Sequence, residues 1–242
     1  MYESIEAFVA SAVEAFGLRG PVYQLGLYES GDPRLQTSLR GCFARTSHVQ
    51  FELSRAAKAD RLPFPDQAAR TVLCIGALDY AFRANQAGNE IARILKPGGK
   101  MLVCAPLAGF VSGPEDLHWR ATPRAVEQLL TAASATVVGW QGAETFPHTM
   151  YGIGFKRPVG ESTVENTRRF LERFQARLDA MAGRRLARLL ARWSRRRCRW
   201  RRREYYRTQF AVHLCADDSL QHDPLLSGPL KDKTGTRLDF LG

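Results

Sequence analysis

Two short runs of consecutive apolar residues constrain the fold of this chain more than any other feature. Residues 71–75 (TVLCI) and 100–105 (KMLVCA) are apolar almost throughout, without the alternation expected of a strand that faces water on one side. Such runs are typical of strands buried on both faces, as in a parallel sheet. Segments with helical character, such as 2–16 and 79–95, flank these strands. The pattern predicts an α/β fold with helices on both faces of a mostly parallel sheet.

The later part of the chain predicts how this sheet ends. Residues 136–142 and 149–156 read as two strands with only a short joint between them. Parallel neighbours need a long crossover, so these two strands are expected to form an antiparallel hairpin. A helix over 123–133 is predicted to begin with Thr122 as its cap and Pro123 in its first position. The other expected elements are strands at 21–28 and 48–53, a short helix at 34–43 and a proline-rich loop at 62–66.

The net charge of +11 is concentrated in one segment. Residues 1–160 carry 16 Lys and Arg against 14 acids, whereas 161–207 carry 16 Arg against 5 acids. Apolar residues recur in this segment at spacings near three and four, which predicts a long amphipathic helix or a helical hairpin broken at Gly183. Residues 208–215 are predicted to add a strand. Over 168–207 the pattern fits nucleic acid, an anionic membrane surface, or docking onto the protein's own helices with the arginines in water.

Cysteine usage and hydropathy indicate a cytoplasmic protein. The five cysteines show neither a CxxC pair nor zinc-ligand spacing, so we expect no disulfide and no metal. No apolar run reaches the length of a transmembrane helix, and the acidic N-terminus does not resemble an export signal. Peripheral contact with a membrane through the basic segment remains compatible with this localisation.

Three motifs, in this order, resemble the class I SAM-dependent methyltransferases. They are the loop ADRLPFPD at 59–66, the segment EIARILKPGGKMLV at 90–103 and the element DLHWRATP at 116–123. The loop and the second segment are similar to those of the small-molecule, type 11-like members of the family. The resemblance spans roughly residues 21–157 and implies a Rossmann-like, doubly wound sheet with an antiparallel final hairpin, followed by an Arg-rich helical extension.

The resemblance also implies S-adenosyl-L-methionine as cofactor and a site beyond the carboxyl ends of the strands. Gly26 would let the backbone approach the cofactor, and Glu52 would accept hydrogen bonds from its ribose. On the acceptor side, His148 is a candidate general base. The complete set of implied cofactor residues is Gln24, Gly26, Glu52, Ala59, Asp60, Arg61, Ile75 and Gly76, and that of implied substrate residues is Tyr80, His118, Trp119, Arg120 and His148.

The glycine motif of this chain departs from the family pattern. Where the family has an acid followed by three spaced glycines, this chain reads QLGLYESG at 24–31. Gln24 replaces the acid, and Tyr28 and Ser30 replace two glycines. Three functions therefore stay open: an active methyltransferase for a small-molecule or glycan-like acceptor, a degenerate fold that serves as partner or scaffold, and a binding module whose function lies in the Arg-rich arm.

The expected organisation is a methyltransferase-like domain over 1–157, a basic helical extension over 158–215 and a loosely ordered tail over 216–242. A sheet that ends near Lys156 looks complete, so truncation after Gly160 is expected to leave a folded body.

Overall fold

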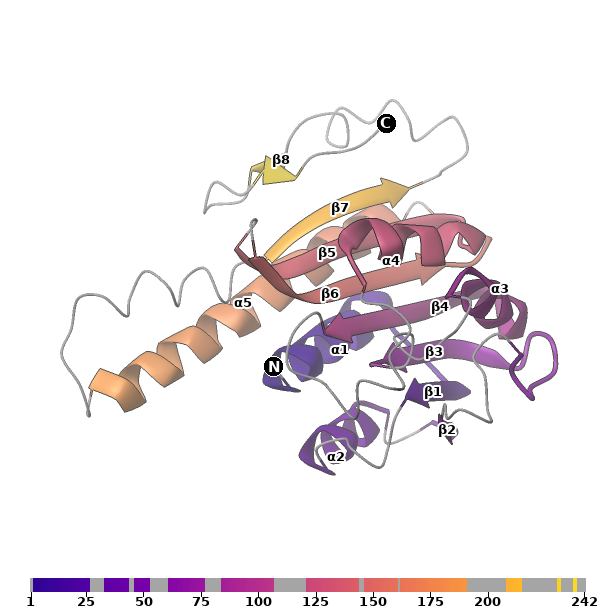
Figure 1. Ribbon diagram of the computed structural model, residues 1–242, viewed down its shortest axis with the longest axis horizontal. Helices are drawn as coiled ribbons and strands as arrows, with labels where there is room; N and C mark the ends of the chain where they lie inside the picture. Colours follow the sequence, from indigo (N-terminus) through magenta and orange to yellow (C-terminus); the bar gives the residue numbers. More distant parts are fainter. Residues whose placement is uncertain are drawn as a thin grey trace.

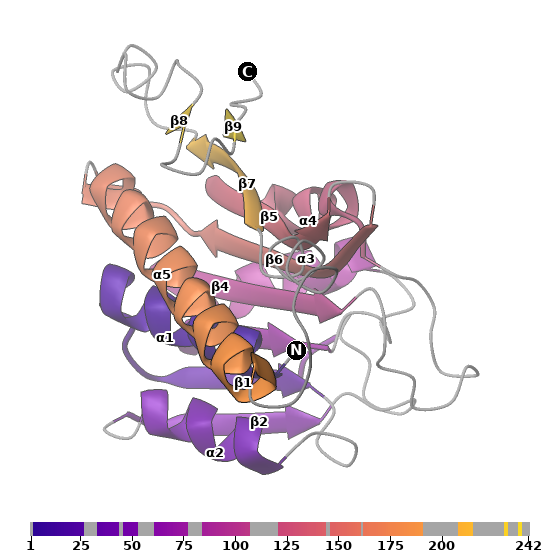
Figure 2. The same cartoon turned by 90° about the vertical axis from the view of Figure 1, so that its left-hand side faces the viewer.

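The computed structural model shows one central sheet with helices on both faces (Figures 1 and 2). The residues that the structure describes are 2–26, 33–43, 46–52, 61–76, 84–106, 121–143, 146–160, 162–190, 208–214, 230–231 and 237–238.

The central sheet has seven strands in the order β2-β1-β3-β4-β6-β5-β7. The first four strands pair in parallel, while β6, β5 and β7 join antiparallel. The predicted Rossmann-like sheet with an antiparallel final hairpin is therefore confirmed. The strands are β1 (Val22–Gly26), β2 (His48–Glu52), β3 (Ala69–Ile75), β4 (Leu95–Pro106), β5 (Ala135–Ala143), β6 (Phe146–Phe155) and β7 (Thr208–Leu214), and a separate short pair is formed by β8 (Leu230–Lys231) and β9 (Arg237–Leu238).

The helices divide between the two faces of the sheet. We call the face that α1, α2 and α5 cover the first face, and the face that α3 and α4 cover the second face (Figure 2). Their bounds are α1 (Tyr2–Phe16), α2 (Pro33–Cys42), α3 (Ala84–Ile94), α4 (Pro123–Leu129) followed by the 3-10 turn η3 (Leu130–Ala132), and α5 (Ser162–Leu190). The predicted start of α4 is confirmed, since the Thr122 hydroxyl accepts a hydrogen bond from the Ala125 N–H at 3.2 Å.

The first face is packed by a cluster of aromatic rings. The Phe8 ring lies 4.8 Å from Tyr151, 5.5 Å from Phe170 and 5.7 Å from Phe174, measured between ring centroids. All four side chains are fully buried. Phe8 comes from α1, Tyr151 from β6, and Phe170 and Phe174 from α5. The helices α1 and α5, which are far apart in the sequence, therefore pack on the same face of the sheet.

Polar contacts also fix α5 to α1. The Arg177 guanidinium donates to the Ser11 hydroxyl at 2.9 Å and pairs with Glu14, which also pairs with Arg173. Of the two predicted forms, the structure shows the single long helix over Ser162–Leu190, which runs through Gly183 without a break. The cost of a helical glycine, about 1 kcal/mol, is small beside the good helix formers around it. The C-terminal part of α5 extends beyond the sheet (Figure 1).

The position of α5 bears on the expected domain boundary. The division at residue 157 stays a prediction, but the expectation that the body is complete without the extension disagrees with the packing. Phe170, Phe174 and Leu178 are 0% exposed inside the main core. The sheet also continues past β6 and β5 into β7, which confirms the strand predicted near 208–215.

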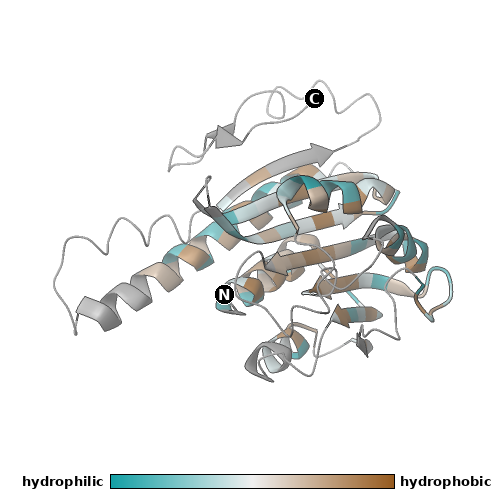
Figure 3. Cartoon of the chain, viewed as in Figure 1, coloured by the Kyte–Doolittle hydropathy of each residue, from teal (hydrophilic) through white to brown (hydrophobic). Residues whose placement is uncertain are grey.

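The second face is mostly aliphatic. Ile91 and Ile94 of α3 and Val126 and Leu129 of α4 pack on β3 and β4, whose middle parts appear hydrophobic in Figure 3. The two helices approach closely at Gly88, where an added Cβ would lie 2.2 Å from the Leu129 carbonyl oxygen. Cys74 and Cys104, in the two apolar strands, are buried as expected, and burial raises the pKa of the Cys104 thiol.

Within the described residues, every helix is too short or too polar to cross a membrane.

Candidate functional site

The carboxyl ends of three parallel strands stand side by side. Gly26, the last residue of β1, is the register partner of Glu52 at the end of β2 and of Ile75 at the end of β3. The chain winds from β1 to β2 in one direction and onward to β3 in the other, so the strand order reverses between β1 and β3. Ligands of open α/β sheets bind beyond the carboxyl ends at such a reversal. Three of the predicted cofactor residues are thus adjacent at this edge.

Gly26 has a packing role in addition to the predicted one. An added Cβ would lie 2.9 Å from the Ile75 carbonyl oxygen, which is closer than real Cβ atoms approach. A side chain at this position would therefore push apart the ends of β1 and β3. The glycine is required by the sheet itself, whatever binds above it.

Gly76 turns the chain away from the sheet directly after β3. Its φ of +60° lies in the left-handed region that glycine adopts without strain. Its N–H donates to the Cys104 carbonyl at 2.8 Å, and no atom of the other described residues lies within 4 Å of the place where a Cβ would stand. The edge is open at this residue.

Gln24 lies deeper in the sheet than the residues of the edge. It is two residues before the end of β1, between Gln50 of β2 and Leu73 of β3, and its exposed fraction is only 5%. Direct contact between Gln24 and a cofactor stays a prediction.

The predicted cofactor loop is described only in part. Ala59 and Asp60 lie outside the described residues, while Arg61 is exposed. Directly after it, the Leu62 N–H donates to the Glu90 carboxylate at 3.1 Å. The start of the loop is thus held by α3.

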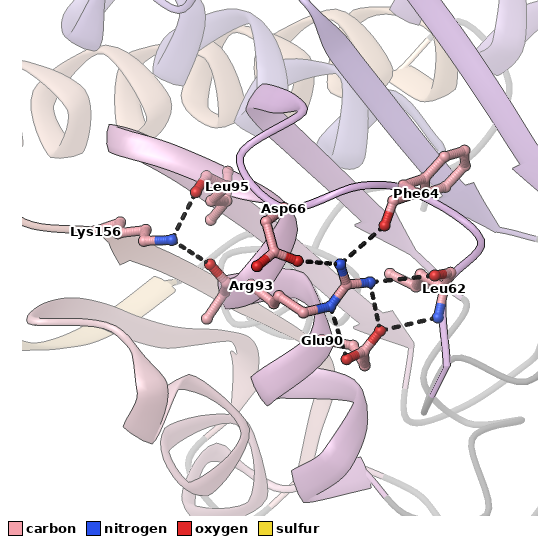
Figure 4. A network of polar contacts seen from close by, with 8 residues as sticks. Leu62, Phe64, Asp66, Glu90, Arg93, Leu95 and Lys156 are labelled. Atoms are coloured by element: carbon pink, nitrogen blue, oxygen red, sulfur yellow. Dashed lines mark hydrogen bonds and ion pairs between the residues drawn. The ribbon is translucent and has the colours of Figure 1, made fainter.

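Arg93 is the centre of a polar clasp that fixes this loop (Figure 4). Its guanidinium donates to the carbonyls of Leu62 and Phe64, at 3.2 and 2.9 Å, and to Asp66 at 2.6 Å. Both oxygens of Glu90 accept from the same guanidinium at 2.8–2.9 Å. The hydrogen bonds with Glu90 and then with Asp66 raise the pKa of Arg93. The hydrogen bonds that Arg93 donates to Glu90 in turn lower the pKa of that carboxyl group.

The clasp shows that the 90–103 motif has a structural role, which the sequence analysis did not predict. Glu90 and Arg93 stand one turn apart on α3, a spacing at which opposite charges pair on a helix. This spacing is the feature of the sequence from which the ion pair between Glu90 and Arg93 could have been predicted. A second cation completes the arrangement, because the Lys156 ammonium donates to the carbonyls of Ala92 and Leu95 at the end of α3, at 2.7 and 2.6 Å (Figure 4).

On the acceptor side, one predicted residue is described. His148 of β6 is 7% exposed, and its Nδ1 lies 2.9 Å from the hydroxyl of Thr149. Thr149 is the register partner of Pro106 at the carboxyl end of β4, so His148 lies near the same edge as Gly26 and Gly76. Outside the described residues lie Tyr80, His118, Trp119 and Arg120.

The first four arginines of the basic segment form ion pairs with two glutamates of the protein. Arg173 and Arg177 pair with Glu14, while Arg168 and Arg169 pair with Glu165. Arg173 and Arg177 thus contact α1, whereas Arg168 and Arg169 pair within α5, and the partner of the basic segment stays a prediction. Residues 191–207 lie outside the described part. Among the described residues, no three His, Cys, Asp or Glu side chains gather in a way that would hold a metal ion.

Comparison with known proteins agrees with the predicted resemblance. The family profile described as "Methyltransferase domain" matches residues 35–103, less than a third of the chain. This stretch includes Glu52, Gly76 and the clasp, so the likeness to the class I SAM-dependent methyltransferases is confirmed over this part of the fold. No curated protein matches the chain significantly in sequence.

Several solved structures are similar to the chain at low identity. The YcgJ protein from Bacillus subtilis is 11% identical, with 62% of this chain and 99% of that chain covered and a TM-score of 0.41. An S-adenosylmethionine-dependent methyltransferase from Mesorhizobium loti is 14% identical, with 58% and 91% covered and a TM-score of 0.36. The [4+2]-cyclase SpnF is 20% identical, with 73% and 66% covered and a TM-score of 0.38. Identities this low do not extend beyond the fold.

Proposed function

We propose that this protein is a SAM-dependent methyltransferase that acts on a small-molecule or glycan-like acceptor. The observation that carries the proposal is the juxtaposition of Gly26, Glu52 and Ile75 at the point where the strand order reverses, within a fold whose residues 35–103 match the methyltransferase domain.

The described residues fit this cofactor at the carboxyl edge. Among the described residues, space is open at Gly76, and Glu52 is the last residue of β2, so its carboxylate is proposed to accept hydrogen bonds from the ribose hydroxyls. Gly26 leaves the backbone of β1 bare between these two positions. When bound, the cofactor supplies a methyl group on a sulfonium, which is already strongly electrophilic.

The protein's part in such a reaction is chiefly positioning. Holding an acceptor nucleophile in line with the transferred methyl group provides most of the acceleration, so no invariant acid or base is required. His148 is the described residue near this edge that is able to take a proton from the acceptor. The glycan-like or other small acceptor is proposed from the type of loop at 59–66.

Titration calorimetry with S-adenosylmethionine and S-adenosylhomocysteine tests the proposal. We expect micromolar binding to the full chain and a loss of at least about tenfold in affinity for Glu52→Gln, since its hydrogen bonds to the ribose would lose their charge. Glu165→Gln is the matched control, because it removes an exposed carboxylate on α5, away from the edge.

The outcome that contradicts the proposal is equally clear. A folded protein that binds neither compound at millimolar concentration is not a SAM-dependent methyltransferase. Equal affinities for the wild type, Glu52→Gln and Glu165→Gln would place the cofactor elsewhere than at this edge.

A further inference from the structure

A second candidate binding site lies at the opposite edge of the sheet. A cavity of about 280 Å³ opens where α1 ends and where β3 and β4 begin, on the first face. Thr71 of β3 and Lys100 of β4, which are register partners, form part of its wall. Thr71 precedes Ile75 by four residues, which is about 13 Å along a strand. The cavity is therefore separate from the carboxyl edge where the cofactor is proposed to bind.

The charge around this cavity is entirely positive. Arg19, Arg70 and Lys100 line it, and its lining includes no carboxylate from the part of the chain that the structure describes. Within the described residues none of the three forms an ion pair, and the one side-chain hydrogen bond among them is a long one, from the Lys100 ammonium to the Gly98 carbonyl at 3.3 Å. The C-terminal end of α1 adjoins the cavity but supplies only about half a negative charge. Most of the charge of three cations thus remains uncompensated.

The excess positive charge around the cavity acts on Lys100. It is half-buried, and burial together with the neighbouring charge of Arg70 lowers the pKa of its ammonium. Keeping the Lys100 ammonium charged in this position costs free energy. A bound anion would offset that cost, because an opposite charge nearby favours the charged form.

Backbone hydrogen bonds hold the cationic segments in a fixed frame. The Thr71 hydroxyl donates to the Arg19 carbonyl at 3.0 Å, and the N–H groups of Arg70 and Thr71 both donate to the Pro21 carbonyl, at 2.9 and 3.2 Å. Gly98, with a φ of +71°, is fixed from the other side, since its N–H donates to the carbonyl of Arg157 at 2.9 Å. The backbone of the site is thus fixed before any ligand arrives, which lowers the cost of binding, while the exposed side chains of Arg19 and Arg70 become ordered on binding.

We propose that this cavity binds the phosphate group of a small molecule through Arg19, Arg70 and Lys100. Guanidinium groups match the geometry of phosphate oxygens, and a lysine ammonium adds a compact charge. A phosphate dianion compensates more of the three positive charges than a carboxylate does. The volume, slightly below that of sites for drug-sized ligands, suits a phosphate with a small organic group.

Titration calorimetry of the full-length protein at low salt tests this site. The probes are inorganic phosphate, phenyl phosphate and acetate. We expect both phosphates to bind, acetate to bind at least about tenfold more weakly, and affinity to fall as salt is added. Tighter binding of phenyl phosphate than of inorganic phosphate identifies a phosphorylated metabolite as the ligand, and equal binding identifies the free ion.

Two variants and one matched control locate the binding. Arg70→Gln and Lys100→Met each remove one cation of the cavity and are expected to weaken phosphate binding at least about tenfold. Arg124→Gln removes an arginine of α4 whose side chain is 79% exposed and lies outside the cavity, and is expected to change nothing. No phosphate binding by the folded wild type, or an equal loss in Arg124→Gln, overturns the proposal.

A titration of the wild type is independent of whether either variant folds. Lys100 is one of six lysines in the chain, so its side-chain NMR signals are resolvable. We expect saturating phosphate to raise the pKa of Lys100 toward its ordinary value. An unchanged Lys100 in the presence of phosphate excludes the site. The test requires no methyl transfer, so failure of the proposed enzymatic function leaves it unaffected.

Discussion

The two faces of the central sheet are packed by different means. On the first face, aromatic rings from α1, β6, α5 and β7 contact one another, and Phe170 and Phe174 both touch Phe210 with ring centroids 5.9 and 6.0 Å apart. On the second face, aliphatic side chains of α3 and α4 meet the sheet, and the polar clasp around Arg93 closes its rim. The first face joins α1 with the much later α5 and β7, whereas the second face is formed by α3, α4 and the strands that they cover.

This difference explains where the chain looks familiar. The matched stretch, 35–103, supplies most of α3, β3 and β4 together with the clasp, which belong chiefly to the second face. On the first face, α2 lies largely within this stretch, whereas α1 comes before it and α5 and β7 come after it. The matched part is therefore packed against segments that lie outside the match.

Truncation after Gly160 should have the largest effect, and it tests whether the first face is essential. The truncation removes Phe170, Phe174 and Leu178 from the core, and each large buried side chain is worth about 2–5 kcal/mol. The sum is comparable to the whole stability of a domain, about 5–15 kcal/mol. We expect a protein without a cooperative thermal transition in circular dichroism.

The control for this truncation is a chain that ends after Ala216. It retains α5 and β7, and with them the described aromatic cluster, and is expected to unfold cooperatively. A cooperative transition in the chain ending at Gly160 would show that the body is complete near residue 157.

Phe174→Ala tests the same face with a single residue. Its ring contacts Phe8, Tyr151 and Phe170, with centroids 5.7, 5.1 and 5.9 Å away, and is fully buried. We expect a loss of about 3–5 kcal/mol in the free energy of unfolding, measured by urea denaturation.

Two other variants provide a comparison for the loss of stability in Phe174→Ala. Phe174→Leu keeps most of the buried volume and should cost clearly less than Phe174→Ala. Ile91→Val, on the second face, should cost about 0.5–1.5 kcal/mol. If Phe174→Ala costs no more than Ile91→Val, the aromatic cluster is not what holds α5 in place.

The contrast between the faces also shows what the sequence reveals and what it does not. Apolar runs and helical spacing predict β3, β4, α1 and the final hairpin because these patterns depend on the local chain. The spacing of Phe170, Phe174 and Leu178 predicts an apolar helix face, but that face fits a membrane, a partner or the protein's own sheet equally well. Only the tertiary structure shows that Phe8 and Tyr151 are its partners.

The two candidate sites also differ in how far the sequence predicts them. The grouping of Gly26, Glu52 and Ile75 is predictable, because parallel strands bring their carboxyl ends to one edge. The phosphate site is not, because Arg19, Arg70 and Lys100 come from three separate segments that no spacing connects.

Arg93→Met tests the clasp on the second face. The substitution keeps the aliphatic part of the side chain but leaves the carbonyls of Leu62 and Phe64 and the Glu90 carboxylate without this donor. We expect a loss of about 2 kcal/mol in stability, limited by the partial exposure of the clasp. Affinity for S-adenosylhomocysteine should also fall, because the loop beginning at 59 is no longer fixed at Leu62.

Arg93→Lys separates geometry from charge in this experiment. A lysine keeps the positive charge but lacks the planar fork that reaches several acceptors at once. We expect it to recover less than half of the lost stability. Full recovery would mean that charge alone, rather than the hydrogen-bond geometry, makes the clasp.

The pH dependence of the clasp gives the smallest expected effect. Hydrogen bonds from Arg93 and from the Leu62 N–H hold the pKa of Glu90 below its ordinary value. A carboxyl group whose pKa is lower in the folded state stabilises the protein fully above its unfolded pKa, about 4.3. That contribution is lost as the pH falls through the lower, folded value. Stability should therefore decrease in acid partly through Glu90.

Comparison with Glu90→Gln isolates this contribution from that of other carboxylates. At neutral pH the wild type should be more stable than Glu90→Gln by about 1 kcal/mol, as is typical of a partly exposed ion pair. The difference should shrink toward zero below the ordinary pKa of glutamate, about 4.3. Urea denaturation of both proteins across this pH range measures it. A difference that stays constant with pH would show that Glu90 acts through packing, and that its charge does not hold the loop to α3.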